Sequence, residues 1–119
     1  MESKHSLTKS FQYALEGLKT GITKGRNFRI QIATGVLATL LGIILKISHS
    51  DWVDLVLVMA SVLILELINT AIEAIVDMVS PEIQEKAKIA KDVSAGAVLV
   101  ASIAAVFIGG LIFLPKILH

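Results

Sequence analysis

The stretch Val62–Asp77, VLILELINTAIEAIVD, decides the fold of this chain, because polar side chains interrupt an otherwise apolar segment of membrane character. Four of them follow one another at offsets of three, seven and eleven residues from the first: Glu66, Asn69, Glu73 and Asp77. At about 100° per residue, these offsets place all four on one narrow stripe of a helix. Carboxylates within an apolar helix of membrane length are costly, so the stripe indicates a functional site with a cation or a water-filled cavity nearby.

The composition of the whole chain also favours a membrane protein. Of its 119 residues, 55% are apolar and 18% are charged, and the mean hydropathy is +0.78. Soluble domains average about 45–50% apolar residues on a set that also counts glycine. The formal net charge is +1, and no clustered basic surface indicates a nucleic-acid partner. Cysteine is absent, which excludes disulfides and thiolate metal sites.

Three apolar segments are long enough to cross a bilayer. We therefore predict one all-α integral-membrane domain, residues 1–119, with transmembrane helices at 30–47, 52–79 and 93–114. The short turn at 46–51 makes the first two helices an antiparallel hairpin. The polar segment 80–92 is predicted to be a cytoplasmic loop, in which Pro81 suits the restart of a short helix.

The distribution of lysine and arginine predicts the orientation in the membrane. Six of these residues lie in the N-terminal segment up to Arg29 and three lie in 80–92, whereas Lys46 and Lys116 lie on the opposite side. The N-terminus and the Asp77 end of the polar stripe should therefore be cytoplasmic, with the C-terminus outside. Glu66 would lie about 16 Å deeper than Asp77, at a rise of 1.5 Å per residue.

The N-terminal segment 5–27 has the pattern of an amphipathic helix that lies in the membrane interface. Its apolar residues recur at helical spacing, with polar residues on the other side: Leu7, Phe11, Leu15, Leu18 and Ile22. A soluble helix packed on a partner would show the same pattern, and the neighbouring spans favour the interfacial interpretation.

Small residues in two spans predict close helix packing and oligomerisation. The third span has one at every fourth position, and the first span has a similar set: Ala97, Ala101, Ala105 and Gly109, then Gly35, Ala38 and Gly42. Such stripes let helix backbones approach closely in lipid. Three spans enclose a polar site poorly on their own, so we expect a homo-oligomer.

The polar stripe carries the groups that phosphoryl transfer requires, which are a divalent cation and an acceptor for the proton of the nucleophile. Mg²⁺ takes one or two carboxylates together with phosphate oxygens and water, and Glu73 and Asp77 lie one turn apart near the surface. Glu66 lies deeper in apolar surroundings that favour proton uptake, which suits a general base. Asn69 lies between them and can hold a carboxylate or a substrate oxygen. Three lysines of the loop are candidate phosphate partners: Lys86, Lys88 and Lys91.

Other interpretations of the stripe are a proton or ion path and a hydrogen-bonded seam between helices. Asn69 and Thr70 alone would favour the seam. The carboxylates favour a functional site, because each costs about 2.5–3.5 kcal/mol at the bilayer centre. The loop lysines by themselves are typical of a surface that faces lipid headgroups. Glycine-rich kinase loops are absent from the sequence, so the residues alone indicate a small three-span protein with a metal-capable cytoplasmic site.

The segment Glu66–Asp77 strongly resembles the signature of the prokaryotic diacylglycerol kinase family of small integral-membrane lipid kinases. The resemblance extends to Arg26–Arg29, to Ala90–Asp92 and to the three-span layout with an N-terminal surface helix, and so covers nearly the whole chain. The sequence around Arg26–Arg29 is similar to the Gram-positive branch, whose members mostly phosphorylate undecaprenol rather than diacylglycerol.

The resemblance implies a homotrimer in the bacterial plasma membrane that uses MgATP to phosphorylate undecaprenol or diacylglycerol, with active sites shared between neighbouring subunits. By position, Glu66 resembles the catalytic base, and Glu73 resembles a metal ligand that also contacts the nucleotide. The remaining site residues implied in this way are the nucleotide contacts and the residues that organise the site: Tyr13, Lys91 and Asp92, then Asn69 and Asp77.

Gly25 is a departure from the family pattern. Family members usually have a glutamate just before the Arg-Asn-Phe segment, and this glutamate contributes a second carboxylate for metal. Its absence removes a charge and an oxygen ligand, so we expect activity with weakened cation affinity. The alternative is a non-catalytic or impaired membrane assembly protein of the same fold.

Overall fold

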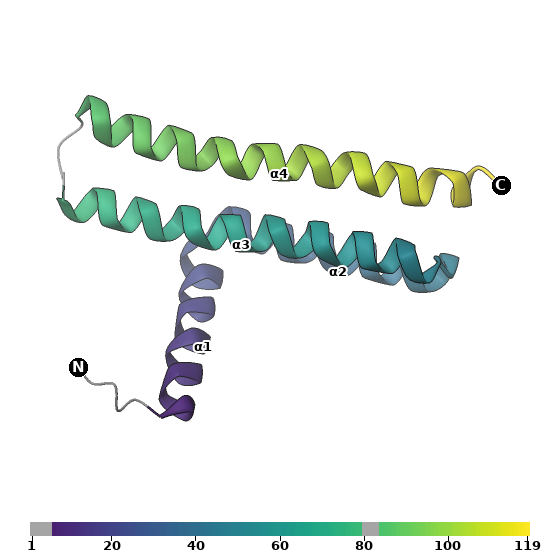
Figure 1. Ribbon diagram of the computed structural model, residues 1–119, viewed down its shortest axis with the longest axis horizontal. Coiled ribbons are helices and arrows are strands. Elements are labelled where there is room, and N and C mark those ends of the chain that lie inside the picture. Colours follow the sequence, from purple (N-terminus) through teal and green to yellow (C-terminus); the bar gives the residue numbers. More distant parts are fainter. Residues whose placement is uncertain (1–5, 80–83) are drawn as a thin grey trace.

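The computed structural model describes residues 6–79 and 84–119, which fold into four α-helices with no strand among the described residues (Figure 1). Figure 1 shows three long helices side by side along the longest axis, with the first helix crossing away from them. These helices are α1 (Leu7–Lys24), α2 (Arg26–Leu45), α3 (His49–Val79) and α4 (Glu85–Ile117). The last three are long and apolar enough to cross a membrane, as the sequence predicted.

The apolar side chains of the three long helices point mostly outward. Large hydrophobic residues on every one of them are exposed, including Leu37, Leu57 and Phe107. The buried apolar core of the described residues is correspondingly small: Phe28, Ile47, Leu55, Val58, Val62 and Ile112. A surface this apolar is suited to lipid rather than to water, so the prediction of an all-α integral-membrane protein is confirmed.

The turn between α2 and α3 is tight, and it makes the two helices the predicted antiparallel hairpin. Lys46 adopts the left-handed conformation that commonly ends a helix, with φ 54° and ψ 55°. The backbone N–H groups of Lys46 and Ile47 donate to carbonyl oxygens in the last turn of α2. Ser48 then accepts a hydrogen bond from the backbone N–H of Asp51 at 3.1 Å and so satisfies a free donor at the start of α3.

A small apolar cluster lies next to this turn and joins three helices. Ile47, Leu55 and Ile112 form its buried centre, and Trp52 packs against them. Gly42 makes room for the indole, because an added Cβ at this position would lie 2.8 Å from Trp52 Cη2. The small residue predicted to allow close approach between helices therefore serves the packing of the α2–α3 hairpin.

Segments that the lysine and arginine distribution places on the same side of the membrane lie at the same end of the molecule. Figure 1 shows the C-terminal end of α3 and the N-terminal end of α4 at one end, towards the side on which α1 joins α2. The turn between α2 and α3 and the C-terminus lie at the other end. The side of the membrane that each end faces remains a prediction.

The structure corrects the predicted loop at 80–92, since α4 already begins at Glu85. Residues 85–92 are rich in good helix formers, and Lys88 bonds Asp92 one turn later at 2.6 Å. Their polar character marks a helix end beyond the apolar run rather than a loop. The restart predicted at Pro81 lies outside the described residues. At its other end α4 continues through Pro115 to Ile117, past the predicted boundary at Leu114.

The junction of α1 and α2 is an elbow rather than the continuous helix predicted for 5–27. α1 ends at Lys24, and α2 begins at Arg26. Arg29 Nη1 donates to the carbonyl oxygens of Ile22 and Thr23 at 2.7 and 3.1 Å, which caps the end of α1. Phe28 is buried against Gly21 inside the elbow. The position of α1 in the membrane interface stays a prediction.

The hairpin packing predicts the outcome of adding one methyl group to Gly42. Gly42→Ala should destabilise the protein by about 1–3 kcal/mol, because the new Cβ meets Trp52 and Ile47 and the cluster is overpacked. Gly96→Ala is the matched control, since a Cβ there meets no atom within 4 Å and alanine favours a helix. Thermal unfolding in detergent measures both variants, and equal melting temperatures would contradict this account of the hairpin.

Candidate functional site

The polar stripe of α3 lies partly against α4, the helix with which α3 packs most extensively. Glu66 and Asn69 are 4% and 7% exposed, whereas Glu73 and Asp77 are exposed towards the end of the helix. The stripe therefore passes from a buried pair to a solvent-accessible pair over three turns. This gradient agrees with the predicted depth of Glu66 beneath the acidic helix end.

Glu66 is the most unusual side chain of the stripe. Its Oε1 is buried and has no hydrogen-bond partner among the residues that the structure describes. Buried polar atoms are normally paired, and an unpaired one calls for an explanation such as a catalytic role or an unoccupied ligand position. The neighbouring Leu67 contacts the α1 elbow, where its Cδ2 lies 2.8 Å from the position of a Cβ on Gly21. The elbow therefore packs on α3 at the residue that follows Glu66.

Asn69 joins the stripe to α4 through a short hydrogen bond. Ser94 Oγ donates to Asn69 Oδ1 at 2.6 Å, and both side chains are buried. Asn69 Nδ2 in turn donates to Glu73 Oε2 at 3.4 Å. Sequence reasoning placed Asn69 between the two carboxylates but missed Ser94. The available signal was its spacing, because Ser94 follows Lys91 by three residues and so shares a helix face with it.

Charged pairs occupy the exposed end of the site. Lys91 Nζ lies 2.7 Å from Asp77 Oδ1 and joins α4 to α3, and Lys88 Nζ lies 2.6 Å from Asp92 Oδ2 within α4. These hydrogen bonds raise the pKa of Lys91 and of Lys88, both of which precede the apolar run 93–114. Both ion pairs stabilise the folded protein at pH values below the ordinary pKa of lysine. This stabilisation is lost as the pH rises through the raised pKa of Lys88 and Lys91. They are exposed, so their contribution to stability is small.

The structure brings most of the predicted site residues to the α3–α4 interface. Asn69 and Glu73 are hydrogen-bonded to each other, and Asp77 is joined to Lys91. Asp92 is paired with Lys88. Tyr13 lies on α1 with 52% of its surface exposed, on the helix that contacts α3 at the elbow. The roles of these residues towards nucleotide and metal stay predictions.

The donor groups among the described residues can contribute to a magnesium site but do not form a complete one by themselves. Groups of three acidic or histidine side chains able to hold a metal are absent from residues 6–79 and 84–119. Glu73 is exposed and is held by Asn69, which suits one carboxylate ligand. Asp77 has Oδ1 engaged by Lys91, so its other oxygen remains for a further partner. Mg²⁺ needs only one or two protein carboxylates when phosphates and water supply the rest.

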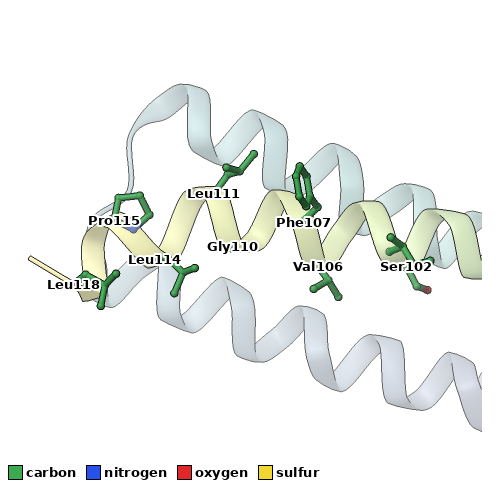
Figure 2. A pocket seen from close by; sticks show the side chains of 9 residues that line it. Ser102, Val106, Phe107, Gly110, Leu111, Leu114, Pro115 and Leu118 are labelled. Atoms are coloured by element: carbon green, nitrogen blue, oxygen red, sulfur yellow. The ribbon is translucent and has the colours of Figure 1, made fainter.

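Two apolar hollows lie along the spans. One, of about 800 Å³, follows the C-terminal half of α4 and is lined by Val106, Phe107, Leu111 and Leu114 among others (Figure 2). The other, of about 650 Å³, lies between α2, α3 and α4 and reaches Val62, one turn before Glu66. Gln31 and Ser102 supply polar groups within this second hollow, with Gln31 Nε2 donating to Ser102 Oγ at 3.5 Å. An apolar chain fits the second hollow in size and character, with one end towards the buried carboxylate.

The fold and the site define a small integral-membrane protein with a polar, carboxylate-containing site at one end of three spanning helices. A sequence model described as prokaryotic diacylglycerol kinase matches residues 12–113. A diacylglycerol kinase of Synechocystis is 45% identical over 114 residues, which cover 95% of this chain and 65% of that protein. The undecaprenol kinase of Bacillus subtilis is 38% identical over 109 residues, which cover 92% of this chain and 89% of that protein.

A diacylglycerol kinase of Escherichia coli K12 is 33% identical over 100 residues, which cover 84% of this chain and 82% of that protein. The chain therefore belongs to the prokaryotic diacylglycerol kinase family, as the resemblance of Glu66–Asp77 indicated. Its relatives include proteins named for two different lipid alcohols.

The geometry at Gly25 changes the expectation for a glutamate at this position. Gly25 has ordinary extended dihedral angles, φ −98° and ψ 98°, but its backbone lies against the last turn of α1. An added Cβ would lie 2.6 Å from the carbonyl oxygen of Gly21 and 3.1 Å from Phe28 Cβ. Close approach, rather than backbone conformation, therefore favours glycine here, and a glutamate would add strain to the elbow together with its charge.

A pair of substitutions at Gly25 separates these two effects. Gly25→Ala and Gly25→Glu should both lower the melting temperature, because either Cβ displaces the α1–α2 elbow at a cost of about 1–3 kcal/mol. Only Gly25→Glu should lower the Mg²⁺ concentration that gives half-maximal activity, since only glutamate adds an oxygen ligand. A Gly25→Ala variant as stable as wild type would refute the steric constraint. Identical Mg²⁺ dependence of both variants would refute the metal role of this position.

Proposed function

We propose that this protein is an integral-membrane lipid kinase that transfers the γ-phosphate of ATP to a lipid alcohol. The observation that carries the proposal is the buried carboxylate of Glu66, whose Oε1 has no partner among the described residues and which lies beneath an exposed group of carboxylates and lysines. A kinase for a membrane alcohol needs a proton acceptor within reach of the lipid and charged groups at the water surface. The polar stripe of α3 spans this distance.

In the proposed reaction, the lipid hydroxyl oxygen attacks the γ-phosphorus of ATP, the bond to the β–γ bridging oxygen breaks, and ADP leaves. Glu66 accepts the hydroxyl proton, and its free Oε1 supports this role because it has no competing partner among the described residues. Glu73 would hold Mg²⁺, which neutralises the phosphate oxygens when it is bound. Lys91 would bind phosphate oxygens from the start of α4. Tyr13 would contact the adenine, Asp92 would contribute to nucleotide binding, and Asp77 would hold Lys91 or share the metal.

The acceptor is proposed to enter from the lipid with its tail in the hollow between α2, α3 and α4. Val62 lines this hollow one turn before Glu66, so a hydroxyl at its inner end would lie near the carboxylate. Apart from Gln31, Thr34, Thr39 and Ser102 the lining is apolar, which suits an acyl or isoprenoid chain. Recognition in this hollow would depend on the shape of the tail rather than on a specific polar contact.

Undecaprenol is the proposed acceptor, with diacylglycerol as the second candidate. The similarity of Arg26–Arg29 to the Gram-positive branch and the 38% identity to the Bacillus subtilis undecaprenol kinase support undecaprenol. The 45% identity to the Synechocystis diacylglycerol kinase supports diacylglycerol.

The proposed location is the bacterial plasma membrane, with the N-terminus and the site cytoplasmic and the C-terminus outside. The greater number of lysine and arginine residues at the site end supports this orientation. The proposed assembly is a homotrimer. The stripe of small residues on α4 supports assembly, because such stripes let helix backbones approach closely in lipid.

An assay with labelled ATP tests the function directly. Purified protein in detergent or nanodiscs receives [γ-³²P]ATP, Mg²⁺ and either undecaprenol or diacylglycerol, and label in the extracted lipid is measured. We expect label in undecaprenol above that in diacylglycerol, with no label when EDTA removes Mg²⁺. The reverse order would assign diacylglycerol as the acceptor. Label in neither lipid, from a protein that retains its melting temperature, would favour the non-catalytic assembly protein.

Replacement of Glu66 by glutamine tests the proton acceptor. The amide keeps the shape of the side chain but cannot accept the proton, so Glu66→Gln should lower kcat by ~10²-fold or more with little change in nucleotide affinity. Glu73→Gln is the matched comparison on the same stripe, and it should raise the Mg²⁺ requirement as well as lower the rate. Wild-type kcat in Glu66→Gln would make this residue structural, and unchanged Mg²⁺ dependence in Glu73→Gln would remove its role as a metal ligand.

A further inference from the structure

Ser94 differs from most of the other hydroxyl-bearing residues of the three long helices in the hydrogen-bond partner of its side chain. Thr39, Ser61 and Thr70 each donate to the carbonyl oxygen one turn back in their own helix, at 2.8, 2.8 and 3.0 Å. This local bond is a common way for a helical hydroxyl to be satisfied in an apolar environment. Ser94 instead reaches from α4 to α3 and donates to Asn69 Oδ1 at 2.6 Å.

The two hydrogen bonds of Asn69, one to Ser94 and one to Glu73, together hold its amide in one orientation. A side-chain amide has one accepting oxygen and one donating NH₂ group, so a donor that engages the oxygen directs the nitrogen elsewhere. In this structure the nitrogen faces Glu73 Oε2 at 3.4 Å. Because an ionised carboxylate only accepts hydrogen bonds, the reversed amide would place two acceptors against each other. The carboxylate of Glu73 therefore sets the orientation of the Asn69 amide, and the Ser94 hydroxyl holds the amide in place by donating to its oxygen.

The hydrogen-bonded residues Ser94, Asn69 and Glu73 pass from a buried end at Ser94 to an exposed end at Glu73. Ser94 is 8% exposed and Asn69 is 7% exposed, so water is a poor substitute partner for either group. Glu73 is exposed at the far end of the chain of hydrogen bonds and can contact a ligand. A carboxylate that binds a metal or its nucleotide works best when a neighbouring hydrogen bond fixes its orientation.

We infer that Ser94 is a positioning residue, which acts through Asn69 to orient the carboxylate of Glu73 towards a bound magnesium–nucleotide complex. The expected effect on kinetics rests on the proposed kinase function. The hydrogen bond itself can be tested without measuring activity. Loss of the Ser94 hydroxyl frees the amide to rotate, and the carboxylate of Glu73 loses its fixed donor. The affinity for MgATP should then fall, whereas the affinity for the lipid alcohol should not.

Kinetics of Ser94→Ala provide the first test, with both undecaprenol and diacylglycerol as acceptors. The KM for MgATP should rise about tenfold, the usual size of such an orienting effect, with an unchanged KM for the lipid. Ser94→Thr retains the hydroxyl and should restore most of the affinity. In an Asn69→Ala background, Ser94→Ala should have no further effect on the KM for MgATP. Ser61→Ala is the matched control, because this exposed hydroxyl bonds only its own helix and the variant should behave as wild type.

Selective labelling provides the second test, because the chain contains two asparagines, Asn27 and Asn69. In protein labelled with ¹⁵N-asparagine, Ser94→Ala should shift the side-chain amide resonances of Asn69 and leave those of Asn27 in place. Unshifted Asn69 resonances, or Ser94→Ala and Asn69→Ala effects that add in full, would overturn the positioning role. A wild-type protein that labels neither lipid would overturn the proposed function and the kinetic role together, while the resonances still decide whether the hydrogen bond exists.

Discussion

The burial of one carboxylate among apolar helices is the constraint on which this structure depends. Glu66 must be accommodated at a depth where neither lipid nor neighbouring apolar side chains can satisfy it, and among the described residues its Oε1 has no partner. The chain compensates nearby rather than at Glu66 itself, by packing α3 most extensively against α4 and by placing Asn69 and Ser94 in that interface. The small apolar cluster around Leu55 and Trp52 secures the opposite end of the same helices. The stability and the site therefore share one helix pair.

The α1–α2 elbow connects the N-terminal helix to the same part of α3. Phe28 fills the inside of the elbow, Arg29 caps the end of α1, and Gly25 permits the backbone to lie against Gly21. The elbow meets α3 at Leu67, the residue directly after Glu66. A rigid elbow thus fixes where α1, and with it Tyr13, lies relative to the buried carboxylate. Substitutions that loosen this corner should affect the site without touching any of its polar groups, because a displacement of about 1 Å in a positioned group is enough to lower activity.

The sequence predicted the parts of the molecule that depend on periodicity and missed those that depend on contacts between helices. Apolar length located the three spans, and helical spacing placed Glu66, Asn69, Glu73 and Asp77 on one stripe. The predicted loop at 80–92 contains a short helix after Pro81, but the apolar run alone does not show that α4 already begins at Glu85, where the Lys88–Asp92 spacing is helical. Ser94 was missed because a lone serine in an apolar helix usually bonds its own backbone, and only the packing of α4 on α3 gives it another partner. The break at Gly25 likewise follows from a contact with Gly21 that no pattern in the sequence encodes.

The chemistry of Asn69 explains why this stripe contains an amide between its carboxylates. Glu66 and Glu73 lie on the same face, and an aspartate at 69 would add a negative charge one turn before Glu73, where like charges repel. An apolar residue would remove the acceptor that Ser94 bonds across the interface, and the hydrogen bond that joins α4 to α3 there would be lost. The amide both accepts from Ser94 and donates to Glu73, so it is the side chain that links the buried interface to the exposed acid. Ser94, Asn69 and Glu73 thus form one hydrogen-bonded unit, and Glu66 lies beside it with an Oε1 that has no partner among the described residues.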